Sequence, residues 1–183
     1  ITTGTHGAHV FVGLIALAYL IAKSNKEGYN EAVKRVEKVL RDFDNKFQVI
    51  VLDNTARTAE EAALSLSCEV GAIVKSLLLK TENKFTLFLV PGDKKASLSK
   101  IKRILKIKDA SMASADEVKN VTGFSIGGVS PVGHINKIDI FMDKSLQRFK
   151  SLFAAAGHPN CIFKINFSDL QKITKSTINE ISE

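Results

Sequence analysis

One lysine of this chain lies in an apolar run, where a charged side chain is unusual. The segment Ala72–Leu79 (AIVKSLLL) is typical of a buried strand. Because side chains on a strand alternate between its two faces, Lys75 shares a face with Ile73 and Leu77. Lysine avoids such a position unless its ammonium group is paired or used. We expect Lys75 to hold a phosphate or a carbonyl oxygen; the alternative is a side chain that reaches water at a sheet edge.

The glycine-rich stretch GGVSPVGH, residues 127–134, offers a different kind of chemistry. Its glycines permit positive φ angles and leave main-chain N–H groups unobstructed, while its proline stiffens the loop. Successive N–H groups in such a turn form a cradle for an anion or for the oxyanion of an ester under attack. The alternative is a plain connection between a helix and a strand. The loop residues taken as catalytic candidates are Gly127, Gly128, Val129, Ser130 and Pro131.

Three polar residues, Thr58, His134 and Asp143, are candidates for binding a substrate beside this loop. His134 is able to act as a general acid or base, the alternative being a surface histidine. Asp143 follows the apolar stretch Ile138–Met142. It either faces the same cavity as Lys75 or caps a helix over the residues that follow it.

A basic run follows the second predicted strand. Residues 94–108 contain seven Lys or Arg residues and no acid. The alternatives are a solvated helix face and a patch that contacts phosphates without reading sequence. The whole chain carries a formal net charge of +7, which favours an anionic partner, with nucleic acid first among them. The residues assigned to the phosphate patch are Lys94, Lys95, Lys100, Lys102 and Arg103.

The periodicities after Asn30 predict alternating helices and strands. Helices are expected over Glu31–Arg41, Thr58–Ser67, Leu98–Leu105, Ser114–Asn120 and Asp169–Lys175. Strands are expected over Phe47–Leu52, Ala72–Leu79, Phe85–Val90, Lys108–Ala113, Ile138–Met142, Ser151–Ala156 and Cys161–Ile165. Capping boxes at Thr58 and Ser114, and a cap at Ser168, mark three helix starts. Short loops between neighbouring strands indicate an α+β fold on a largely antiparallel or mixed sheet.

Cysteine and histidine usage argues against disulfide and metal chemistry. The two cysteines, Cys68 and Cys161, lie far apart without a CxxC spacing, which is typical of reduced thiols in a cytosolic protein. The four histidines and the scattered acids form no zinc-binding pattern. We therefore expect no metal and no cofactor.

The N-terminal segment differs from the rest of the chain. Val10–Ala22 is an unbroken apolar run, shorter than the roughly 20 residues of a membrane-spanning helix. Thr3–Ile21 resembles part of subunit III of the haem-copper oxidases. The segment is interpreted as a stray fused fragment, as a hydrophobic anchor over residues 1–22 that attaches the protein to a membrane, or as a helix packed on the domain. We predict a hydrophobic appendage over residues 1–28 and one domain over residues 29–183.

Several separated motifs of that domain resemble one family, the YbaK-like editing domain associated with prolyl-tRNA synthetase. They occur in the family's order and spacing, and they are TARTAEEAA, CEVGAIVKSLLLK, LFLVPGDKK, TGFSIGGVSPVGH and AAAGHP. The resemblance implies a compact α+β domain around a mixed, curved sheet. It also implies that Lys75 is the family's essential lysine, that Gly127–Pro131 is its GxxxP loop, and that Asp143 is an aspartate near the pocket.

The resemblance further implies an activity. Members of this family hydrolyse the ester of tRNA that carries the wrong amino acid, typically tRNA-Pro charged with cysteine or alanine. The implied partners are aminoacyl-tRNA and prolyl-tRNA synthetase, without a metal or a covalent protein nucleophile. The alternative is a non-catalytic module that binds tRNA or a nucleotide in the same cleft.

Overall fold

The structure is a computed structural model that describes residues 27–54 and 56–183. Ala32–Glu183 form one compact unit. The predicted N-terminal helix and membrane anchor lie outside the described residues. The predicted boundary after residue 28 falls in the first turn of helix α2 (Glu27–Phe43) and stays a prediction. In the described ranges, no helix is both long and apolar enough to cross a bilayer.

The described strands form one mixed sheet, as predicted. Its order is β1-β7-β6-β2-β3-β5-β8, and β4 pairs with β2 beside this path. β2 runs antiparallel to β3 and parallel to β6, and β3, β5 and β8 run parallel to one another. The strands are β1 (Val49–Val51), β2 (Ile73–Thr81), β3 (Lys84–Pro91), β4 (Ala110–Met112), β5 (Asp139–Asp143), β6 (Leu152–His158), β7 (Cys161–Ile165) and β8 (Thr177–Asn179).

Two of the three predicted helix caps are present, and helix α2 begins at Glu27, before the expected Glu31. Both capping boxes are present, because the Thr58 and Ser114 side chains accept from the N–H groups three residues on. The predicted cap at Ser168 is wrong: Asn166 caps the last helix and accepts from the N–H of Asp169. Besides α2, the described helices are α3 (Ala59–Leu66), α4 (Leu98–Leu105), α5 (Ala115–Thr122), α6 (Phe167–Thr174) and the short 3-10 helices η1 (Val70–Ala72) and η2 (Lys144–Arg148).

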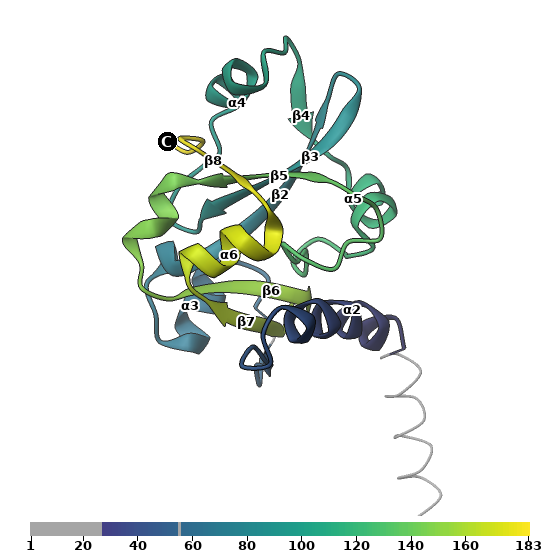
Figure 1. Cartoon of the computed structure of the whole chain (residues 1–183), viewed down its shortest axis with the longest axis vertical. Coiled ribbons are helices and arrows are strands. Elements are labelled where there is room, and N and C mark those ends of the chain that lie inside the picture. The colour runs from purple at the N-terminus through teal and green to yellow at the C-terminus, as the bar shows by residue number, and fades with distance from the viewer. Residues whose placement is uncertain (1–26, 55) are drawn as a thin grey trace, which may run out of the picture. The chain divides into compact units, whose positions relative to one another are not determined.

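The core lies around the central strands. Leu87, Phe88, Leu89 and Val90 of β3 are fully buried, so both faces of this strand are covered. In Figure 1, β2, β3 and β5 run side by side, with α4 and β4 near one end of them. The α2 helix lies beside the hairpin of β6 and β7 in the same view.

One edge of β2 lacks a strand partner over part of its length. β6 pairs with β2 only as far as Val74, and β4 pairs with it only from Leu79 onward. Between these points Lys75, Ser76 and Leu77 have a paired strand on the β3 side alone. The sheet is therefore interrupted next to the lysine that the sequence singled out.

Candidate active site

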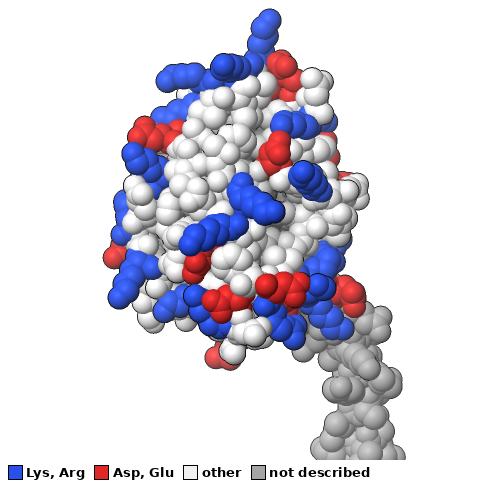
Figure 2. All heavy atoms as spheres, in the orientation of Figure 1, with Lys and Arg blue, Asp and Glu red and all other residues white. Residues whose placement is uncertain are grey.

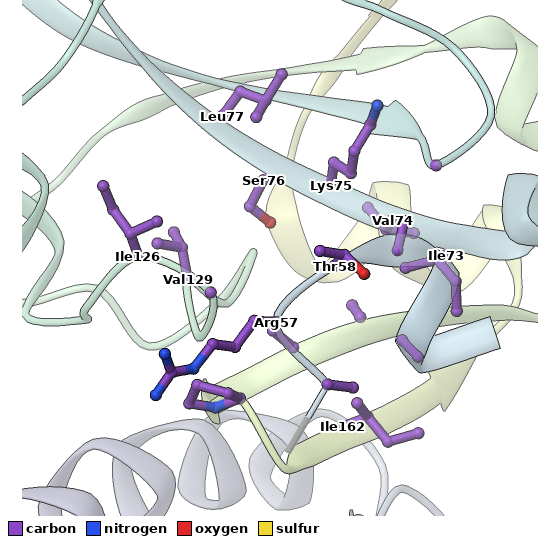
Figure 3. Close-up of a pocket in the computed structure, with 18 of the residues that line it drawn as sticks. Arg57, Thr58, Ile73, Val74, Lys75, Ser76, Leu77, Ile126, Val129 and Ile162 are labelled. Carbon is purple, nitrogen blue, oxygen red and sulfur yellow. The ribbon is translucent and has the colours of Figure 1, made fainter. Parts of the chain in front are cut away.

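A cavity of about 410 Å³ occupies this interruption. Its walls come from β2, from the start of α3, from the glycine loop and from the β6–β7 hairpin, and most of them are apolar (Figure 3). A mostly apolar cavity with a few polar groups is typical of a small-molecule site. Four predicted site residues line it, namely Thr58, Lys75, Gly127 and Val129.

Lys75 extends from β2 with its ammonium group only partly exposed. Its Nζ donates to the main-chain carbonyl of Lys94, in the turn after β3. Burial lowers the pKa of Lys75, and the negative charges of Glu60 and Asp93 partly oppose that shift. An ammonium has three N–H donors, so two remain for a ligand. Lys75 therefore lines the cavity and keeps N–H donors for a ligand.

Neighbouring side chains of β2 point in opposite directions. Figure 3 shows the Lys75 ammonium on one side of the strand and the Ser76 hydroxyl on the other, toward Thr58. Ser76 lines the cavity, and its buried Oγ has no hydrogen-bond partner among the described residues. Sequence reasoning missed Ser76 because a serine in a strand carries no pattern that marks it. Its hydroxyl is available to a polar group of a ligand.

The glycine loop packs closely against the β6–β7 hairpin. Gly127 adopts φ +92°, a conformation that favours glycine, and faces Arg57 and Pro159. At Gly128 a Cβ atom would lie 2.8 Å from the Cα of His158. The Gly128 N–H already donates to the carbonyl of Ser125, so the expected cradle of N–H groups does not include it.

Both ends of the loop are tied to helix α2. The guanidinium of Arg35 donates to the carbonyls of Gly123 and Gly133, each at 3.1 Å. It also lies over the ring of Phe124, 5.2 Å from the ring centroid. Arg35 thus holds the segment from Gly123 to Gly133 against helix α2. Sequence alone does not indicate this role, because the contacts join distant parts of the chain.

His134 and Asp143 lie outside this cavity, contrary to the expectation that they bind substrate in it. The Nε2 of His134 lies 2.7 Å from the carbonyl oxygen of Ser130. Nε2–H is the donor, because a carbonyl oxygen only accepts. Burial lowers the pKa of His134. His134 therefore positions the loop and does not contact a ligand in the cavity.

Asp143 caps η2 and holds the C-terminal residues. Its side chain accepts from the N–H of Ser145 at 2.8 Å and from the N–H groups of Ile181 and Ser182 at 2.8 and 2.7 Å. Burial raises the pKa of Asp143, but the hydrogen bonds from Ser145, Ile181 and Ser182 outweigh it and lower the pKa overall. The helix-cap alternative is the correct one.

The remaining loop candidates support the cavity wall without lining it. Ser130 is buried, and its Oγ accepts from the N–H of Val132. Thr58 combines two roles, since it lines the cavity and also caps α3 by accepting from the N–H of Glu61 at 3.1 Å.

The predicted phosphate patch divides into two groups. Lys94 and Lys100 line a second, smaller hollow near the C-terminus. Lys102 and Arg103 lie in the last turn of α4, where a cation stabilises the helix end, and Lys95 is exposed in the turn before α4. In Figure 2 blue side chains are prominent at the end of the molecule where α4 lies in Figure 1.

Neither cysteine lines the cavity, and both are free thiols. Burial raises the pKa of Cys68, which disfavours the thiolate that a nucleophile requires. In the part of the chain that the structure describes, no three His, Cys, Asp or Glu side chains are grouped as a metal site would need.

The comparison with known families decides the identity of this domain. Residues 53–173 match the family described as the aminoacyl-tRNA editing domain. The chain belongs to this family. The match contains all the residues that line the cavity, from Ala56 to Ile162.

Relatives of this editing domain occur both inside larger proteins and as short chains. The proline–tRNA ligase of Caldicellulosiruptor bescii is 30% identical over 91% of this chain. The chain spans 29% of that ligase's length. The uncharacterized protein YwhH of Bacillus subtilis is 28% identical, and the match covers 80% of this chain and 94% of YwhH.

Solved structures share the fold of the editing domain. A protein described as a candidate trans-editing enzyme for prolyl tRNA synthetase is 34% identical, with a TM-score of 0.79. The match covers 83% of this chain and 97% of that one. The prediction of a YbaK-like α+β domain associated with prolyl-tRNA synthetase is confirmed.

Proposed function

We propose that this editing domain hydrolyses misacylated tRNA in trans, most readily tRNA-Pro that carries alanine or cysteine. One observation carries the proposal: Lys75, a partly buried lysine, lines the cavity that the glycine loop closes, and its ammonium is held at the edge of β2 by the carbonyl of Lys94. Relatives of the domain include proline–tRNA ligases and a candidate trans-editing enzyme, which supports tRNA-Pro as the substrate. We infer that the reaction takes place in the cytoplasm.

The size of the cavity fits the end of a charged tRNA. Its volume of about 410 Å³ is in the range of about 300–1,000 Å³ that holds drug-sized ligands. That leaves room for an aminoacyl group together with the terminal adenosine. The apolar side chains around Ile73 and Val129 suit a small aliphatic group, and the Ser76 hydroxyl suits a polar one.

The proposed reaction needs no protein nucleophile. A water molecule adds to the ester carbonyl, the bond from the carbonyl carbon to the ribose oxygen breaks, and the ribose oxygen takes up the proton. Lys75 holds the adenosine phosphate or the ester carbonyl, and N–H groups of the loop other than that of Gly128 hold the oxyanion. Rate then comes from orientation and electrostatics, with the ribose hydroxyl, or the thiol of a cysteinyl substrate, assisting the attack.

The test is deacylation of Ala-, Cys- and Ser-charged tRNA-Pro by the wild type and by Lys75→Ala. We expect the variant to lose at least about 10²-fold in rate, as for the loss of one oxyanion contact. Lys164→Ala is the matched control, because Lys164 is an exposed strand lysine outside the cavity. Equal rates for Lys75→Ala and the wild type would remove Lys75 from the reaction. Tight tRNA binding without turnover by the wild type would support the non-catalytic module instead.

A further inference from the structure

A second hollow of about 280 Å³ lies beside the editing cavity and has a different character. We call it the basic hollow. The start of α4, the residues after β5 and the C-terminal residues form its walls, and in Figure 1 the C-terminus lies next to β8 and near α4. Four of its lining residues carry cations, and they are Lys94, Lys100, Lys144 and Arg148.

The cations of the basic hollow outnumber its carboxylates. Asp143 and Glu180 are the two acids among the lining residues. The carboxylate of Asp143 is 2% exposed and is occupied by main-chain N–H groups, so it faces inward. The guanidinium of Arg148 donates three hydrogen bonds to the carboxylate of Asp93, one at 2.8 Å and two at 3.1 Å, and is therefore fixed in place.

Two of the lysines keep their charge available. Among the described residues, Lys94 and Lys144 have no carboxylate within ion-pair distance. The Nζ of Lys100 donates to the carbonyl of Ser182 at 2.6 Å, which orients it at the wall of the hollow. An arrangement of fixed and free cations around one depression is suited to an anion with several oxygens.

The basic hollow and the editing cavity meet at one contact. The ammonium of Lys75 donates to the carbonyl of Lys94, and Lys94 is one of the residues that line the basic hollow. A ligand that extends out of the editing cavity past Lys75 therefore reaches the basic hollow next. A nucleic acid strand carries a phosphate at each nucleotide along such a path.

We propose that the basic hollow binds a phosphate of the single-stranded 3′ end of tRNA, upstream of the esterified nucleotide. The proposal rests on the proposed function for the identity of the strand. The sequence predicted a phosphate patch on the basic run around α4. The proposed site is instead formed by three separated segments, which are the start of α4, the residues after β5 and the C-terminal residues. Lys144 is its most informative member, because it is exposed and was not marked by any motif.

The probe is the uncharged trinucleotide CCA, whose binding does not depend on any hydrolytic activity. Its Kd is measured over a series of salt concentrations for the wild type, Lys144→Gln and Lys94→Gln. Each variant should weaken binding and reduce the slope of log K against log salt by about 0.7. Lys150→Gln is the control, an exposed lysine close in the chain that does not line the hollow. Thermal melting checks that each variant is folded.

Three outcomes overturn the proposal. One is an unchanged slope in both Lys144→Gln and Lys94→Gln. Another is an equal loss in Lys102→Gln, which would return the contact to the face of α4. The third is an inhibition constant of inorganic phosphate, in competition with CCA, that equals the Kd of CCA. The hollow would then be a site for small anions and not for a nucleic acid strand. If charged tRNA is not hydrolysed but CCA binds as expected, the proposed function fails while the phosphate site stands.

Discussion

A close main-chain approach between the glycine loop and the β6–β7 hairpin gives a sharp test of the loop's role. A Cβ added at Gly128 would lie 2.8 Å from the Cα and 2.9 Å from the N of His158. Carbon atoms in contact are about 3.5–4.0 Å apart, so in Gly128→Ala the loop must move by roughly 0.7–1 Å. The atoms that the new Cβ would meet belong to the main chain of Gly157 and His158, so a change of side-chain rotamer cannot relieve the contact.

A displacement of this size should be costly for catalysis. A misplacement of about 1 Å costs up to about 10²-fold in rate, and overpacking costs about 1–3 kcal/mol of stability. We expect Gly128→Ala to lower kcat/KM for deacylation by about 10- to 100-fold at a temperature where it is folded. Single-turnover hydrolysis of charged tRNA-Pro measures this, and urea denaturation measures the stability.

The neighbouring glycine provides the comparison. At Gly127 the nearest atom to an added Cβ would be the Cγ of Pro159 at 3.6 Å, which is an ordinary contact. Gly127→Ala strains φ by about 1–2 kcal/mol but leaves room for the methyl group. It should therefore lose less activity than Gly128→Ala. Wild-type kcat/KM in Gly128→Ala, or a larger loss in Gly127→Ala, would refute the steric argument.

Two further predictions concern protonation. Because burial lowers the pKa of Lys75, kcat/KM should fall as pH rises through a pKa below the ordinary lysine value of 10.5, after subtraction of uncatalysed hydrolysis; an alkaline limb at or above pH 10.5 would contradict this. Asp143→Asn should lower the free energy of unfolding by about 2–3 kcal/mol at neutral pH, because its amide nitrogen replaces either the oxygen that accepts from both Ile181 and Ser182 or the one that accepts from Ser145. The folded-state pKa of Asp143 is lowered, so the wild type should lose this stabilisation as pH falls through that pKa, and urea denaturation at neutral and acidic pH should show the difference between the two proteins shrinking.

Local signals in the sequence predicted the elements well. The capping boxes at Thr58 and Ser114 are confirmed, because each depends on residues within one turn. The error at Ser168 arose because Asn166 is an equally good cap two residues earlier. The short strand β8 was missed, since three residues carry too little pattern to mark a strand.

The site was predicted less completely, because it depends on contacts between distant segments. Lys75 was identified from its own neighbours, since a lysine in an apolar strand is conspicuous. Arg35 behind the loop and Lys144 in the basic hollow carry no such signal, because ordinary surface positions share their spacing. Asp143 was misplaced because sequence alone does not show which edge of a sheet the C-terminal residues cover.

The interruption in the sheet has a consequence for how the specificity of this domain can change. The carbonyl of Leu78 accepts from Ala113, on the side of β2 that faces away from β3. Since main-chain groups alternate along a strand, the N–H and the carbonyl of Ser76 point to that same side, into the gap. These two groups belong to the backbone, so substitutions of the surrounding side chains leave them in place. Under the proposed function, mutation can therefore reshape the side-chain wall of the cavity while these two main-chain groups stay constant.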